Sequence, residues 1–201
     1  MQTTLAQSTS PSLPNFAATL PGKLLIGLSA TAVVAAAAHV AIPLPFTPVP
    51  FILTPLAVLG VGLALGPVAG FFTLLAYLAE GAMGLPVFSP TGPGGIAQLF
   101  GPTGGYLMAY PLVAAIAGGL AQLFVRRMPR FLAATIAATV AIAFLFVGGA
   151  AWFMQYAHHS LQATWIGSVA PFLPGEAVKI LAAAGIYSAL TRSAQAETPN
   201  S

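Results

Sequence analysis

Cysteine is absent from this chain, and charged side chains are scarce. Six Lys and Arg and three Asp and Glu make up only 4% of 201 residues, while hydrophobic residues make up 58%. Soluble domains carry about 25% charged residues, so this composition excludes a soluble globular protein. The lack of cysteine excludes disulfides, thiol nucleophiles and thiolate metal sites. The net charge of +3 rests on a few scattered basic residues, which does not indicate binding to nucleic acid.

Six apolar runs predict an all-α integral membrane protein with six transmembrane helices. Each run is close to the roughly 20 residues needed to cross a bilayer, although the second and third are shorter. Pro67 separates the second run from the third, because proline ends or breaks a helix. The runs cover residues 24–42, 51–66, 68–84, 107–125, 131–152 and 171–191. Four prolines between residues 43 and 50 predict an extended connector after the first run.

The segment before Lys23 is rich in Ser, Thr, Pro and Gln and carries no charge. This composition predicts a disordered leader over residues 1–22, followed by a membrane domain over 23–192 and a polar tail over 193–201. The first apolar run also has features of a secretory signal. A signal usually begins with its positive charge, whereas 22 residues precede this lysine, so we interpret the run as a retained span.

The distribution of basic residues predicts the orientation of the spans. With six spans both termini lie on one side, and the loops of the opposite side contain no Lys or Arg. The basic residues of the first side are Lys23, Arg126, Arg127, Arg130 and Arg192. Because cytoplasmic loops carry an excess of Lys and Arg, we expect a multi-pass cell-membrane protein with both termini in the cytoplasm.

The stretch between the third and fourth runs, residues 81–106, is dense with Gly and Pro: GAMGLPVFSPTGPGGIAQLFGPTGGY. Irregular backbone between membrane spans is tolerated where protein or a water-filled cavity satisfies its polar groups. We therefore predict that this central loop forms the wall and lid of an outward-facing pocket. Glu80 lies just before it. Its carboxylate either belongs to the site or reaches the headgroup region, and the sequence leaves both open.

Lys179 is the one basic residue that does not fit the orientation pattern. It lies five residues past Pro174, about 7.5 Å along a helix and so within the outer half of the bilayer. Glu176 stands three residues earlier, on the same helix face. A Lys or Asp at the centre of a span costs about 2.5–3.5 kcal/mol, so such residues are more often functional than incidental. The pair forms either a structural salt bridge or the acceptor and donor of a ligand site.

Ala32 and Ala36 lie four residues apart in the first run, among many other small residues. Small side chains at this spacing allow another helix to approach closely. The neighbour is either a helix of the same subunit or a partner protein that docks on this face.

Other chemistries find little support. The His-His-Ser stretch at 158–160 lacks an orienting acid for a hydrolase, and neighbours in sequence do not form a triad. His39, Glu80 and Glu176 have no recognised metal-ligand spacing. GPTGGY lacks the Lys-Ser/Thr pair that a nucleotide-binding loop requires. We therefore expect no enzymatic activity, no catalytic residue, no cofactor and no metal.

Three motifs resemble the BioY family, the biotin-specific substrate-binding (S) components of energy-coupling-factor (ECF) transporters. They are GLPVF at 84–88, GPTGGY at 101–106 and PFLPGEAVK at 171–179. The resemblance covers residues 43–190 and includes the order of the six spans. One departure is Glu176, where family members usually carry Asp.

The resemblance implies capture of biotin from outside for import driven by two ATPase subunits through a transmembrane coupling subunit, which docks on Ala32 and Ala36. It implies that Glu176 accepts a hydrogen bond from a ureido N–H of biotin and that Lys179 donates to the ureido oxygen. The implied substrate-binding residues are Glu176, Lys179, Gly101, Thr103, Gly104, Gly105, Tyr106, Phe88 and Glu80.

Some alternatives stay open at this point. They are an S component for another vitamin, a non-transporting membrane subunit and an intramembrane enzyme. Apart from biotin and the ECF subunits, the only expected partners are membrane lipid and further copies of the chain in a homo-oligomer. The group that binds the carboxylate of biotin is not assigned.

Overall fold

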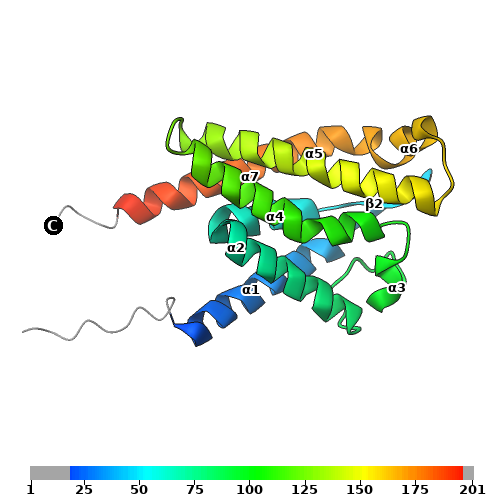
Figure 1. The fold of residues 1–201 in the computed structure, drawn as a ribbon, viewed down its shortest axis with the longest axis horizontal. Helices are drawn as coiled ribbons and strands as arrows, with labels where there is room; N and C mark the ends of the chain where they lie inside the picture. The colour runs from blue at the N-terminus through cyan, green and yellow to red at the C-terminus, as the bar shows by residue number, and fades with distance from the viewer. Residues whose placement is uncertain (1–18, 197–201) are drawn as a thin grey trace, which may run out of the picture.

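The structure is a computed structural model, and it describes residues 19–196. The chain forms a bundle of long helices with a small hairpin and two short helices at one end (Figure 1). In order, the elements are α1 (Leu20–His39), β1 (Ala41–Leu44), β2 (Thr47–Ile52), α2 (Thr54–Ala82), α3 (Gly95–Leu99), α4 (Gly104–Phe124), α5 (Arg130–Tyr156), α6 (Leu161–Ser168), the 3₁₀ turn η2 (Ala170–Phe172) and α7 (Leu173–Ala196).

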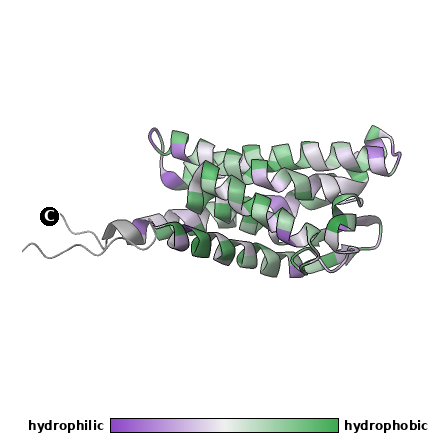
Figure 2. Cartoon of the chain, turned by 60° about the horizontal axis from the view of Figure 1, so that its bottom comes forward, coloured by the Kyte–Doolittle hydropathy of each residue, from purple (hydrophilic) through white to green (hydrophobic). Residues whose placement is uncertain are grey.

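The predicted all-α membrane fold is confirmed. Within residues 19–196, five segments are long and apolar enough to cross a membrane: α1, α2, α4, α5 and the stretch Leu161–Arg192, which contains α7. Hydrophobic residues run along these helices, and hydrophilic ones gather toward the ends of the bundle (Figure 2). The helices therefore present apolar surface along the length that a bilayer would cover.

Helix α2 consists of two halves that correspond to the second and third predicted runs. The chain breaks helical geometry at Gly66, where φ is 80° and ψ is 179°, one residue before Pro67. A Cβ added to Gly70 would lie 3.2 Å from the Cα of Gly62. In a straight helix eight residues span about 12 Å, so the chain turns sharply at Gly66 and the two halves pack together. The predicted break is confirmed.

Glycines bring the backbones of α2 and α4 into contact. A Cβ on Gly62 would overlap the carbonyl oxygen of Ala114, and a Cβ on Gly118 would overlap the carbonyl oxygen of Gly62. Close approach at small residues is the usual way for membrane helices to pack, because van der Waals contact replaces the hydrophobic effect there.

The connector after α1 is extended as predicted, but it pairs into an antiparallel hairpin that the sequence analysis did not predict. Ala41 pairs with Ile52, and Leu44 pairs with Thr47. Phe51 lies in β2 and α2 begins at Thr54, so the prediction that a helix starts at residue 51 is wrong. The prolines argued against a strand, because proline cannot donate a backbone hydrogen bond to a neighbouring strand. A two-stranded hairpin nevertheless tolerates proline at positions where the missing N–H would face away from the partner strand.

Two irregular stretches contain more helix than predicted. The central loop includes α3, and its last three residues, 104–106, begin α4. Helix α5 continues to Tyr156, past the predicted end at 152, and α6 forms within the loop that follows it.

Helix α1 begins at Leu20, inside the predicted leader. The rest of that leader, 1–18, and residues 197–201 of the predicted tail lie outside the described residues.

The two ends of the bundle differ in character. The hairpin, α3 and α6 lie at one end, while the start of α1, the α4–α5 connection and the later part of α7 lie at the other (Figure 1). The basic residues used for orientation fall at this second end: Lys23, Arg126, Arg127, Arg130 and Arg192. Lys179 lies in the early part of α7, toward the hairpin end.

Candidate functional site

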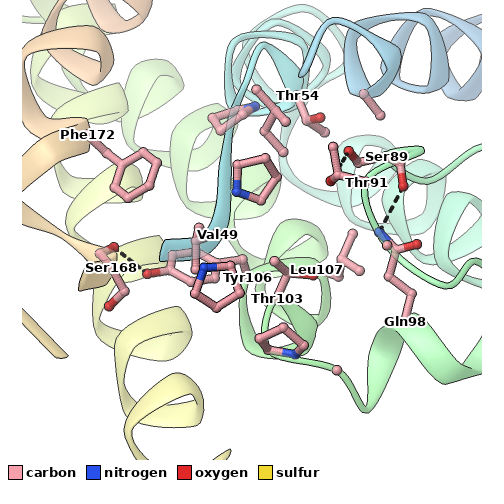
Figure 3. A pocket seen from close by; sticks show the side chains of 18 of the residues that line it. Val49, Thr54, Ser89, Thr91, Gln98, Thr103, Tyr106, Leu107, Ser168 and Phe172 are labelled. Carbon is pink, nitrogen blue, oxygen red and sulfur yellow. Dashed lines mark hydrogen bonds between the residues drawn. The ribbon is translucent and has the colours of Figure 1, made fainter. Parts of the chain in front are cut away.

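A cavity of about 330 Å³ lies at the hairpin end of the bundle. Its walls come from the end of α1, the hairpin, α2, the central loop, α4, α5 and α7. Side chains that are far apart in sequence converge on it, among them Val49, Thr103, Tyr106 and Phe172 (Figure 3). Its volume is within the range of about 300–1,000 Å³ typical of small-molecule sites.

The buried pair at the start of α7 forms one wall of this cavity. Glu176 and Lys179 are only 5% and 4% exposed, and Lys179 Nζ lies 2.6 Å from Glu176 Oε1. Lys179 Nζ also donates to the carbonyl oxygen of Ile52 in β2 at 2.5 Å. It lies 4.2 Å from the centre of the Phe51 ring, which packs against α7 where Gly175 has no side chain. The pair therefore fastens the hairpin to α7.

The second oxygen of the carboxylate has no such contact. Glu176 Oε2 is buried and has no hydrogen-bond partner among the described residues. Leaving a buried charged acceptor unsatisfied is costly, so this atom is suited to accept a hydrogen bond from a ligand N–H. Lys179 has three N–H groups and uses two in the contacts above, which leaves one for a ligand acceptor. The wall thus offers an acceptor and a donor side by side.

The central loop forms another wall of the cavity, and Gln98 organises this loop. The Gln98 side chain donates from Nε2 to the carbonyl oxygen of Ser89 at 3.3 Å and accepts at Oε1 from the Gly94 N–H at 3.1 Å. The hydroxyls of Ser89 and Thr91 are 2.9 Å apart, and both face the cavity region in Figure 3. The sequence did not assign these three polar residues to the site; the available signal was a Gln in an otherwise apolar stretch.

Hydrogen bonds from two aromatic residues hold the central loop and one edge of the cavity in place. Trp152 Nε1 of α5 donates to the carbonyl oxygen of Gly101 at 2.9 Å. Tyr106 of α4 donates to the carbonyl oxygen of Ser168 at 2.6 Å, and Figure 3 shows this bond at the edge of the cavity. Tyr77, Tyr110 and Phe172 complete an aromatic lining. A cavity of this kind holds an apolar ring between aromatic faces and polar atoms at its edges.

Comparison with known proteins identifies the family. A sequence profile of the BioY family matches residues 12–196. This chain belongs to the BioY family. The biotin transporter BioY of Rhodobacter capsulatus is 37% identical over 166 residues, which cover 78% of this chain and 86% of that protein. The probable biotin transporter BioY of Pyrococcus horikoshii is 49% identical over a shorter stretch of 71 residues, 35% of this chain and 43% of that protein.

A solved structure agrees with this assignment. The S-component for biotin from an ECF-type ABC transporter superposes with a TM-score of 0.77 at 28% sequence identity. The superposition covers 85% of this chain and 90% of the other. The resemblance inferred from the sequence motifs is therefore confirmed. BioY proteins are transporter components, so the intramembrane enzyme considered above is excluded.

The structure brings five of the nine residues implied by the BioY motifs to the cavity. Glu176 and Lys179 line it from α7, and Gly101, Thr103 and Tyr106 line it from the loop and the start of α4. The other four lie elsewhere.

Gly104 and Gly105 begin α4 and are covered by α5 rather than facing the cavity. A Cβ on Gly104 would overlap the carbonyl oxygen of Leu99, and one on Gly105 would overlap the Trp152 side chain. These glycines allow close packing of the loop and α5 on α4, which is a different role from the predicted lid.

Phe88 and Glu80 lie behind or beside the cavity. The Phe88 ring packs edge-on against Tyr77, with ring centres 5.5 Å apart, and Tyr77 in turn lines the cavity. Glu80 Oε1 accepts a hydrogen bond from Thr31 of α1 at 3.1 Å. Glu80 therefore links α1 to α2 and does not contribute to the cavity wall.

Two other predicted features have clear positions. Ala32 and Ala36 are exposed on α1, on the face away from the buried residues Thr31, Val34 and Ala38. Beside them an apolar groove of about 610 Å³ runs between α1, α2 and α7.

In the 158–160 stretch, the Ser160 hydroxyl accepts from the Ala163 N–H at 3.3 Å, so this serine caps α6.

Proposed function

We propose that this protein is the biotin-binding component of a biotin importer and that biotin binds in the cavity between α7, the hairpin and the central loop. One observation carries the proposal: the unpartnered Glu176 Oε2 beside Lys179 in the wall of an aromatic cavity. The names of the Rhodobacter and Pyrococcus relatives and of the solved S-component support biotin as the ligand.

The chemistry of biotin fits this wall. Its ureido group has two N–H donors and a carbonyl acceptor, joined to an apolar ring and chain. Glu176 Oε2 accepts from one ureido N–H, and the third N–H of Lys179 donates to the ureido oxygen. The apolar ring packs against Tyr106 and Phe172. Glu176 is one methylene longer than the Asp that the resemblance implies at this position, and its Oε1 is in direct contact with Lys179.

Import needs an energy source, and this chain has no nucleotide-binding loop. We therefore propose that an ECF coupling subunit and two ATPase subunits act with it. The exposed face of Ala32 and Ala36 and the apolar groove beside it form the proposed docking surface. Small side chains let a coupling helix approach the α1 backbone, and the groove accepts its larger apolar side chains.

Uptake of labelled biotin tests this function and its docking surface together. Cells that express the chain with an ECF module should accumulate biotin, and Ala32→Trp should reduce uptake at least about fivefold because it blocks close helix approach. Biotin affinity of the purified variant should stay within about twofold of the parent, since the cavity lies on other residues. Ala143→Trp on the exposed face of α5 is the matched control and should leave uptake unchanged. Equal loss of uptake in both variants would contradict the assigned surface.

The basic residues at the end opposite the cavity support a proposal for the orientation. We propose that both termini lie in the cytoplasm and that the cavity opens to the outside. Because the chain has no cysteine, single cysteines report on each side without background. Gln162→Cys on α6 should react with an impermeant maleimide on intact cells. Met128→Cys in the α4–α5 connection should react only after the cells are lysed. Labelling of Met128→Cys alone on intact cells would reverse the orientation.

A further inference from the structure

We infer that this protein recognises biotin by its ureido end and does not need the free carboxylate, so that neutral biotin carboxamides bind about as tightly as biotin. The inference rests on the proposed function and extends it to the range of ligands. It depends on where the positive charges of the chain lie.

The cavity has a single basic side chain to offer. The whole chain contains six Lys and Arg, and all except Lys179 lie at the end of the bundle opposite the hairpin. Arg192 on the same helix is 13 residues beyond Lys179, about 20 Å along the axis. No histidine lines the cavity within the described residues. A ligand carboxylate therefore meets Lys179 or no cation at all.

Lys179 is poorly placed to bind a carboxylate. Its ammonium group is already held by Glu176 Oε1 and by the carbonyl oxygen of Ile52, and the Phe51 ring covers it. A ligand carboxylate at this position would also face the free Glu176 Oε2, and like charges at such short range repel. A ureido group avoids this conflict because it presents donors to Glu176 and an acceptor to Lys179.

The loop side of the cavity offers hydroxyl groups instead. Ser89 and Thr91 contribute two hydroxyls 2.9 Å apart, and Thr91 is exposed, so this side lies at the mouth. Figure 3 shows Ser89 and Thr91 on one side of the cavity and Phe172 and Ser168 on the other. With the ureido group at α7, the valeryl chain of biotin extends toward these hydroxyls. A neutral hydroxyl donates to a carboxylate oxygen or to an amide carbonyl oxygen, and a carboxylate at the mouth stays hydrated.

Titration of the purified full-length chain with three ligands tests the inference. Biotin and biotin N-methylamide should bind with dissociation constants within about fivefold of each other. Biotin methylated at one ureido nitrogen should bind at least about tenfold more weakly, because it lacks a donor for Glu176. If biotin binds and the amide binds more than about fiftyfold more weakly, the carboxylate contacts a cation and the inference is wrong. If biotin itself does not bind, the proposed function fails with it.

A variant at the mouth provides a second, independent test. Thr91→Lys adds a cation at an exposed loop position, next to the expected carboxylate. It should raise the affinity for biotin relative to the N-methylamide by at least about threefold at low salt, and the gain should shrink as salt screens the new charge. Gln162→Lys on the exposed face of α6 is the control for added charge and should leave the ratio unchanged. An unchanged ratio in Thr91→Lys would mean that the carboxylate does not lie at this mouth.

Discussion

Replacing Lys179 by methionine should lower the affinity for biotin at least about tenfold in protein that still folds. Methionine keeps the length and apolar stem of lysine but removes the donor to the ureido oxygen. A hydrogen bond to a charged group contributes about 1.5–3 kcal/mol, which corresponds to roughly ten- to over a hundredfold in affinity. The substitution also removes the contacts of Nζ with Glu176 and Ile52, so Glu176 loses its partner and the hairpin loses one of its contacts with α7.

Titration of the variant in detergent measures this effect, with gel filtration and helical content as checks on folding. Lys23→Met is the matched control, because Lys23 is exposed in the first turn of α1 at the opposite end of the bundle. It should bind biotin as the parent does. Parental affinity in folded Lys179→Met would show that the pair is structural and that the ligand binds elsewhere.

Gly62→Val should prevent the chain from folding into a stable bundle. A side chain at Gly62 would overlap the backbone carbonyl of Ala114, and neither helix backbone can move aside without breaking the α2–α4 contact. Overpacking typically costs about 1–3 kcal/mol where side chains can adjust, and a clash with backbone leaves no such adjustment. After purification in detergent, we expect most of the variant protein to be lost from the monodisperse fraction, or its midpoint of thermal unfolding to be clearly lower than that of the parent.

Gly60→Val provides the comparison on the same helix. A Cβ on Gly60 would meet no atom within 4 Å, so this variant should fold and bind biotin like the parent. Both substitutions introduce the same side chain into α2, and any difference between them therefore reports the local contact. Equal stability of the two variants would contradict the close packing of α2 on α4.

The features that the sequence predicted well have a local physical cause. Apolar runs identify membrane helices because backbone polar groups in lipid must be satisfied within the segment. The break before Pro67 was predicted because proline cannot continue the helix, and the structure places the turn at Gly66. Glu176 and Lys179 stood out because charges inside a span are costly, and the structure places both in the cavity wall.

The missed features depend on contacts between distant parts of the chain. The hairpin requires Ala41 to pair with Ile52, and the four prolines between residues 43 and 50 interrupt the alternation by which strands are recognised in a sequence. Gln98 organises the central loop through Ser89 and Gly94, and nothing in its own position in the sequence indicates those partners. Glu80 was a candidate for the site, but its carboxylate accepts a hydrogen bond from Thr31, 49 residues earlier in the chain.

The same limit applies to the glycines of the GPTGGY motif. A Gly-rich run predicts irregular backbone, and so residues 104–106 were expected in the loop. The structure instead uses Gly104 and Gly105 at the start of α4, where Leu99 and Trp152 leave no room for a side chain. Glycine is needed here for close packing within a helix, which composition alone does not distinguish from a flexible turn.

The assignment of biotin to the cavity beside Glu176 and Lys179 is tested by calorimetric titration of the purified parent chain. This assignment predicts saturable binding of one biotin per chain, no measurable heat with riboflavin or thiamine at the same concentrations, and a loss of at least about tenfold in affinity in Glu176→Gln. A flat titration with biotin, or saturable binding of another vitamin in its place, would contradict it.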